Sequence, residues 1–78
     1  MDRQKAALAN LEADIWAADF NGTVDAVERH GDGYTIRLRC GSRTFVRSGI
    51  GAAVLEDELS TDRQRLVAEA RAALLAKS

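Results

Sequence analysis

Proline is absent from the 78 residues of this chain, although average usage predicts about four. Proline interrupts helices and removes a hydrogen-bond donor from sheets, so its absence predicts continuous helices and strands. The six glycines are then expected to supply the turns between them.

Cysteine is nearly absent as well. The single Cys40 excludes a disulfide within the chain and indicates a reducing compartment. No stretch approaches the roughly 18 apolar residues of a membrane span. Charged residues interrupt the apolar positions of the first 14 residues, which argues against a secretory signal. We therefore expect a cytoplasmic protein of a bacterial or host cell, with no membrane partner.

The chemistry-bearing residues are few. His30 is the only histidine, and a metal site needs several converging ligands. A nucleophilic Cys40 would need a nearby base, but His30 lies at the other end of the predicted second strand. The glycine-containing segments 31–33 and 49–51 match no complete phosphate-loop pattern and are interpreted as turns. The sequence thus predicts no enzyme, no metal and no cofactor.

Composition and length indicate one small globular domain over residues 1–78. Apolar residues make up 46% of the chain and charged residues 29%, which is not the signature of a disordered segment. A domain of this size buries only a modest core.

Helical periodicity marks the two ends of the chain. At the N-terminal end, Leu8, Leu11, Ile15 and Ala18 follow at helical spacing. Residues 19–22 end this helix, where an Asn-Gly pair offers the left-handed conformation of a helix end.

The C-terminal helix is expected from residue 61 to about residue 76. Thr61 and Gln64 match a capping box at its start. Its predicted apolar face consists of Leu66, Val67, Ala70, Ala73 and Leu74.

Alternating polarity predicts three strands between these helices. The clearest covers residues 34–40, and a Gly41-Ser42 hairpin joins it to residues 43–47, placing Leu38 opposite Phe45 and Arg39 opposite Thr44. Residues 23–29 form the least regular strand, in which a bulge would reconcile Val24 with Val27.

Residues 48–51 are expected to break the sheet, and residues 52–59 to form a short helix, with a strand as the alternative. The order α-β-β-β-α-α predicts an α+β fold. Its three-stranded antiparallel sheet is packed by the N-terminal and C-terminal helices in two layers.

The net charge of −1 conceals a division along the chain. Residues 1–28 hold six acids and two bases, whereas residues 29–49 hold five arginines and one acid. Residues 50–78 hold five acids and four bases. Opposed fields of this kind affect partner choice more than fold.

The arginines of the hairpin are the first candidate binding set: Arg37, Arg39, Arg43 and Arg47. Arg37 and Arg39 share the outer face of the sheet, whereas Arg43 and Arg47 have the parity of Phe45 and emerge at the inner margins. Guanidinium groups bind phosphate or carboxylate in forked geometry. The outer face, however, offers no aromatic residue for base stacking. The plainer interpretation is a solvated face.

The acids are the second candidate binding set: Glu12, Asp19, Asp25, Glu28, Glu56, Asp57 and Glu58. Carboxylates spread over a small surface can imitate phosphates and occupy a basic channel. The alternative is that they only keep the surface hydrated.

Trp16 is the third candidate. It lies about 120° from the centre of the first apolar stripe, with Glu12 and Asp19 one turn to either side. An exposed tryptophan is typical of an interface anchor, whereas a buried Trp16 would cover the core edge or pack under the last helix.

These features favour a small non-catalytic protein-binding module that blocks a surface of a nucleic-acid-handling protein or ribonucleoprotein complex. One specific form is a phage- or mobile-element-encoded inhibitor of host defence, of the anti-CRISPR kind. The first alternative is a small nucleic-acid-binding regulator that uses the arginine-rich hairpin. The second is a structural module that dimerises through its helices; we expect a monomer or a weak homodimer.

Overall fold

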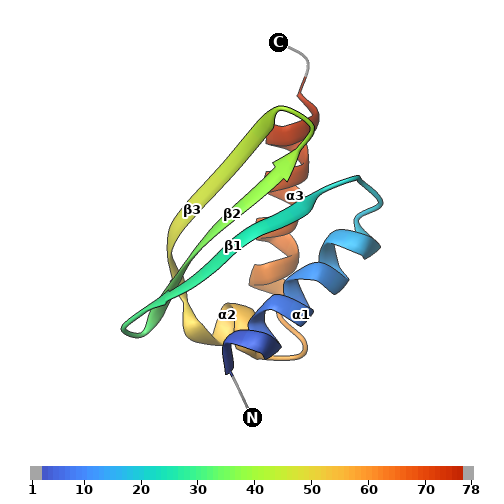
Figure 1. Ribbon diagram of the computed structural model, residues 1–78. Helices are drawn as coiled ribbons and strands as arrows, with labels where there is room; N and C mark the ends of the chain where they lie inside the picture. Colours follow the sequence, from blue (N-terminus) through green and yellow to red (C-terminus); the bar gives the residue numbers. More distant parts are fainter. Residues whose placement is uncertain (1–2, 77–78) are drawn as a thin grey trace.

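The computed structural model describes residues 3–76, and its element order is the expected α-β-β-β-α-α. The elements are α1 (Arg3–Ala17), β1 (Thr23–His30), β2 (Gly33–Cys40), β3 (Arg43–Gly51), α2 (Ala52–Glu56) and α3 (Thr61–Leu75). The strands form one antiparallel sheet in the order β1-β2-β3, and the helices pack against one of its faces (Figure 1). The predicted α+β fold is confirmed.

The core lies between the sheet and the two long helices. Its fully covered side chains include Leu11 from α1, Ile36 and Leu38 from β2, and Leu55 from α2. In the described part of the chain no helix covers the opposite face of the sheet (Figure 1), where Arg37, Arg39 and Val46 are exposed. The two-layer arrangement therefore leaves one sheet face open to solvent.

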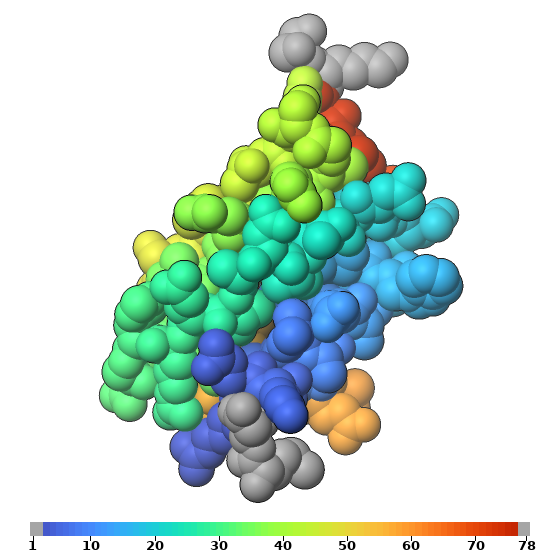
Figure 2. Space-filling model, in the orientation of Figure 1, coloured from blue at the N-terminus to red at the C-terminus, as the bar shows by residue number. Residues whose placement is uncertain are grey.

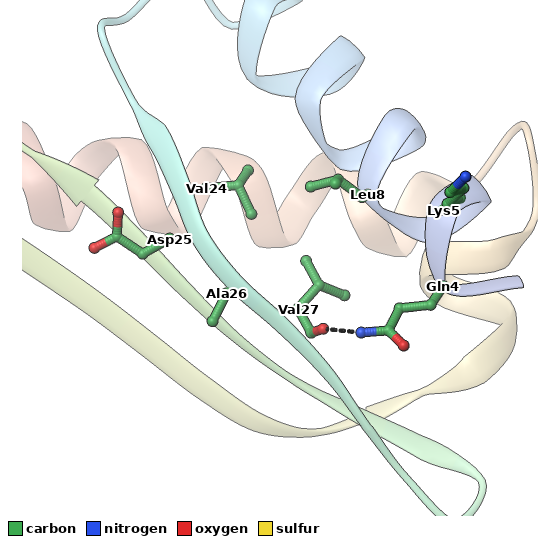
Figure 3. Close-up of a pocket in the computed structure, with 7 residues that line it drawn as sticks. All are labelled: Gln4, Lys5, Leu8, Val24, Asp25, Ala26 and Val27. Atoms are coloured by element: carbon green, nitrogen blue, oxygen red, sulfur yellow. Dashed lines mark hydrogen bonds between the residues drawn. The ribbon is translucent and has the colours of Figure 1, made fainter. Parts of the chain in front are cut away.

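The predicted bulge in β1 is present. The pairing of β1 with β2 shifts register between Val24 and Ala26, which leaves Asp25 as the extra residue. Val24 and Val27 consequently lie on the α1 side of the strand, and Asp25 lies on the other side (Figure 3). The strand itself runs one residue further than expected, to His30.

The predicted end of β3 at residue 47 is wrong, because residues 48–51 continue the sheet. Leu38 pairs with Phe45 and Arg39 with Thr44, as the hairpin predicted. The same register continues to Ile36 opposite Arg47, and it shifts between Ile36 and Tyr34, so that Tyr34 pairs with Ile50. Gly49 has a φ of 70°, so a glycine bulge absorbs the extra residue and returns Ile50 to the core.

The left-handed residue that follows α1 is not the predicted one. The helix ends at Ala17, and Asp19, with a φ of 58°, adopts the left-handed conformation that was assigned to the Asn-Gly pair. The Asp19 amide donates to the Trp16 carbonyl at 3.1 Å. Aspartate tolerates this conformation better than most residues because its side chain is short and polar.

Helix α2 ends at Glu56, three residues before the expected boundary, and the strand alternative for this segment is wrong. The predicted capping role of Thr61 is also wrong. Ser60 is the N-cap of α3, and its Oγ accepts from the Arg63 amide at 3.1 Å. A side-chain oxygen just before the first helical residue satisfies an amide of the first turn.

The buried face of α3 differs from the predicted one in two residues. Ala73, which was expected there, is exposed, whereas Arg63 is buried, with a relative exposure of 2%. Its Nε donates to Asp14 Oδ2 at 2.6 Å, and its terminal nitrogens donate to the carbonyls of Val54, Asp57 and Glu58. One guanidinium group thus joins α1 and α3 to the segment around α2.

Asn10 completes this connection from α1. Its side-chain nitrogen lies 2.9 Å from the Leu55 carbonyl and within 3.3 Å of the carbonyls of Glu56 and Asp57. These carbonyls are at the C-terminal end of a five-residue helix, where they have no intrahelical partner. Asn10 and Arg63 therefore stabilise a helix too short to persist alone.

Candidate interaction surface around Trp16

Trp16 lies on the solvent side of the last turn of α1. Its neighbour Ile15 is buried with 4% exposure, whereas Trp16 is 87% exposed. Successive helical residues differ by about 100° around the axis, so burying Ile15 turns Trp16 away from the sheet. The sequence left open whether this side chain is exposed or covers the core; the structure shows it exposed, and the alternative of a core position is wrong.

Phe20 brings a second aromatic side chain beside Trp16. The chain turns at Asp19, and the half-buried Phe20 packs against the edge of the core. A hollow of about 370 Å³ lies between the end of α1 and the start of β1; it is bounded by Glu12, Ile15, Trp16, Phe20, Asn21, Gly22, Thr23 and Val24. A second, of about 530 Å³, is bounded by Trp16, Asp19, Phe20 and Asn21. In Figure 2 this part of the chain, in light blue, forms the right-hand margin of the molecule.

Glu12 and Asp19 give these hollows a negative charge. Both residues are exposed, and none of the ion pairs formed within residues 3–76 involves either carboxylate. The C-terminal end of α1 adds the negative end of its helix dipole. We call the set Glu12, Trp16, Asp19, Phe20 and Asn21 the Trp16 surface.

The other predicted acids do not join this surface. Asp25 lies 3.4 Å from Arg39, and Glu28 lies 3.5 Å from His30. The acids that follow α2 form a separate group at the other end of the sheet. Within it the Asp57 and Glu58 residues are exposed, and their backbone carbonyls accept from Arg63.

Glu56 is turned inward and holds a buried tyrosine. The Tyr34 hydroxyl donates to Glu56 Oε2 at 2.6 Å, and Arg29 Nη1 lies 3.8 Å from the same oxygen. Burial raises the pKa of the Tyr34 hydroxyl above 10.0, and the hydrogen bond to the Glu56 carboxylate raises it further. Glu56 is thus occupied within the fold rather than available to a partner.

The arginine set is divided by internal pairing. Arg39 pairs with Asp25, and Arg47 donates to Glu69 of α3 at 2.9 Å while its guanidinium lies 5.3 Å from the Phe45 ring centre. Arg37 and Arg43 form no ion pair with any residue of the described chain. Internal pairing therefore divides the four arginines into two with an acidic partner and two without one in the described chain.

A further hollow of about 280 Å³ follows the seam between α1 and β1 (Figure 3). Its apolar lining consists of Leu8, Val24, Ala26 and Val27, and Gln4 Nε2 donates to the Val27 carbonyl at 2.6 Å. This bond occupies a backbone acceptor on the outer edge of β1. Together with the bulge, it hinders the addition of another strand there.

Comparison with protein-family models, curated proteins and solved structures finds no match to this chain. Among residues 3–76, no cluster of three or more His, Cys, Asp or Glu side chains is arranged to hold a metal ion. Within the same range, no helix has the length and apolar character required to cross a bilayer. The function must therefore be argued from the surface itself.

Sequence reasoning identified Trp16, Glu12 and Asp19 but missed Phe20 and Asn21, which were assigned only to the helix end. An aromatic residue four positions after an off-stripe tryptophan was the available signal. Helical periodicity does not predict the position of the Phe20 side chain, because Phe20 lies beyond the end of α1. The direction of this side chain depends on the left-handed conformation of Asp19.

Proposed function

We propose that this chain is a small non-catalytic protein-binding module that docks on its partner through the Trp16 surface. The observation that carries the proposal is the 87% exposure of Trp16 in a fold whose other aromatic residues are at least half buried. Leaving an indole in water is unfavourable, and binding a partner removes that unfavourable exposure. Tryptophan is also among the residues most enriched at binding hot spots.

A specific form of this function is occlusion of a basic surface on a nucleic-acid-handling complex, as in an anti-CRISPR-type inhibitor from a phage or mobile element. Its support is the two carboxylates beside Trp16, Glu12 and Asp19, which form no ion pair within residues 3–76. Such a partner protein or ribonucleoprotein would present cationic residues that normally contact phosphates.

The test compares three forms of the chain as affinity baits in lysate of the cells in which it occurs. We expect the unmodified chain and Leu59→Ala to recover the same dominant complex, and Trp16→Ala to lose it. Leu59 is a matched control because it is also 87% exposed but lies in the loop before α3. Equal recovery by all three baits would refute docking through Trp16.

The nucleic-acid-binding alternative receives less support, because Arg39 and Arg47 already pair with acids of the same chain. It predicts binding to duplex DNA at low salt, with a salt dependence that weakens in Arg37→Ala. Absence of binding at low salt would remove this alternative.

A further inference from the structure

Trp16, Phe20 and Asn21 line both of the hollows at the end of α1. Each hollow brings one carboxylate to these aromatic side chains: Glu12 lies in the hollow beside β1, and Asp19 lies in the hollow beside the turn. The two acids therefore line different hollows, and Trp16 borders both.

Among residues 3–76, no basic side chain lines either hollow. The sequence contains no Lys or Arg from residue 6 to residue 28. Arg71 of α3 approaches the end of α1, but its Nε donates to the Ala18 carbonyl at 3.1 Å and it lines a different hollow with Asp14. The charge of Glu12 and Asp19 is thus left for a partner to neutralise.

Resting on the proposed docking role, we infer that the Trp16 surface binds a partner segment with two arginine or lysine side chains, one in each hollow. A guanidinium or ammonium group is attracted to the face of an indole ring. The same cation can bond the adjacent carboxylate while its methylene stem packs against Phe20.

An apolar segment fits this surface less well. It would cover the aromatic rings, but it would also remove water from Glu12 and Asp19 without giving either carboxylate a partner. The penalty of desolvating an unpaired charge selects against aliphatic and acidic segments. The positions of the two acids beside Trp16 therefore favour cationic partner segments over aliphatic or acidic ones.

The probe is a short flexible peptide with two arginines separated by one serine, which places their Cα atoms about 7 Å apart when extended. Matched peptides carry two lysines, two leucines or two glutamates in place of the arginines. Trp16 is the only tryptophan of the chain, so its fluorescence reports directly on this surface. We expect the arginine and lysine peptides to bind at least about tenfold more tightly than the others.

Two pairs of substitutions separate local from general charge effects. Glu12→Gln with Asp19→Asn removes both local charges, and asparagine retains tolerance for the left-handed backbone at position 19. Asp57→Asn with Glu58→Gln makes the same change of net charge on the separate acidic group. We expect only the first pair to lower the affinity for the arginine peptide, by about tenfold.

Equal affinity for the leucine and arginine peptides would overturn the inference, and so would equal losses from the two pairs of substitutions. Capture of the partner complex that depends on Trp16 but not on Glu12 and Asp19 would refute charge selection while leaving the docking role intact. Undiminished capture of the partner complex by Trp16→Ala would instead refute the proposed function.

Discussion

At the scale of single residues, the least expected position is Arg63. Its spacing from Leu66, Val67 and Ala70 places it on the apolar stripe of α3, so the sequence contained a signal. Charged residues are rarely buried unless they are paired, so Arg63 was left out of the predicted apolar face of α3. The partner, Asp14, lies 49 positions away, a separation that helical periodicity does not address.

Replacing Arg63 is expected to destabilise the fold severely. Arg63→Met keeps an unbranched side chain but leaves Asp14 unpaired and three carbonyls without their donor. Breaking a buried charge pair from one side costs about 3–5 kcal/mol of the free energy of unfolding. Urea denaturation followed by circular dichroism measures this loss.

The control for this prediction is Arg65→Met on the exposed side of α3. Arg65 has a side chain 71% exposed and lies 3.9 Å from Asp62. Its substitution should change the free energy of unfolding by no more than about 0.5 kcal/mol. Similar losses from both substitutions would show that Arg63 is no more than a surface residue.

At the scale of elements, local patterns predicted the regular parts of the sheet. Alternation in residues 34–40 and a glycine-first turn were sufficient to pair Leu38 with Phe45. The end of β3 was wrong because two glycines within four residues are typical of a break. Whether such a segment breaks or bulges depends on whether a later residue reaches the core, which Ile50 does.

The bulge in β3 makes Gly49 sensitive to substitution for a reason that is purely conformational. A Cβ at Gly49 would meet no atom within 4 Å, but the φ of 70° is unfavourable for an L-residue. We expect Gly49→Ala to lower the free energy of unfolding by about 1–2 kcal/mol. Gly49→Asn should lower it less, because asparagine tolerates the left-handed region, and equal losses in urea denaturation would contradict this explanation.

At the scale of the whole molecule, the charge division of the sequence becomes ion pairing between elements. Arginines of the sheet meet acids from other parts of the chain: Arg29 meets Glu56 and Arg47 meets Glu69. The candidate binding residues were predicted from the distribution of charge along the sequence. The sequence does not reveal which of these charges are neutralised by ion pairs within the fold. Glu12 and Asp19 emerge as candidates only after that internal pairing is known.

The stability of the whole fold should depend on alkaline pH through Tyr34. Its pKa is raised above 10.0 in the folded state by burial and by Glu56, so the folded chain retains a proton that the unfolded chain releases. This contribution is complete below pH 10 and is lost as the pH rises through the folded-state pKa.

Tyr34→Phe should lower the free energy of unfolding by about 1 kcal/mol at neutral pH. Above pH 10, the stability of this variant should decline less steeply than that of the unmodified chain. Urea denaturation over a pH series measures both slopes, and the absorbance of tyrosinate reports Tyr34 alone because the chain has one tyrosine. Parallel slopes above pH 10, or tyrosinate formation at the pH of a free tyrosine, would show that folding does not hold this proton.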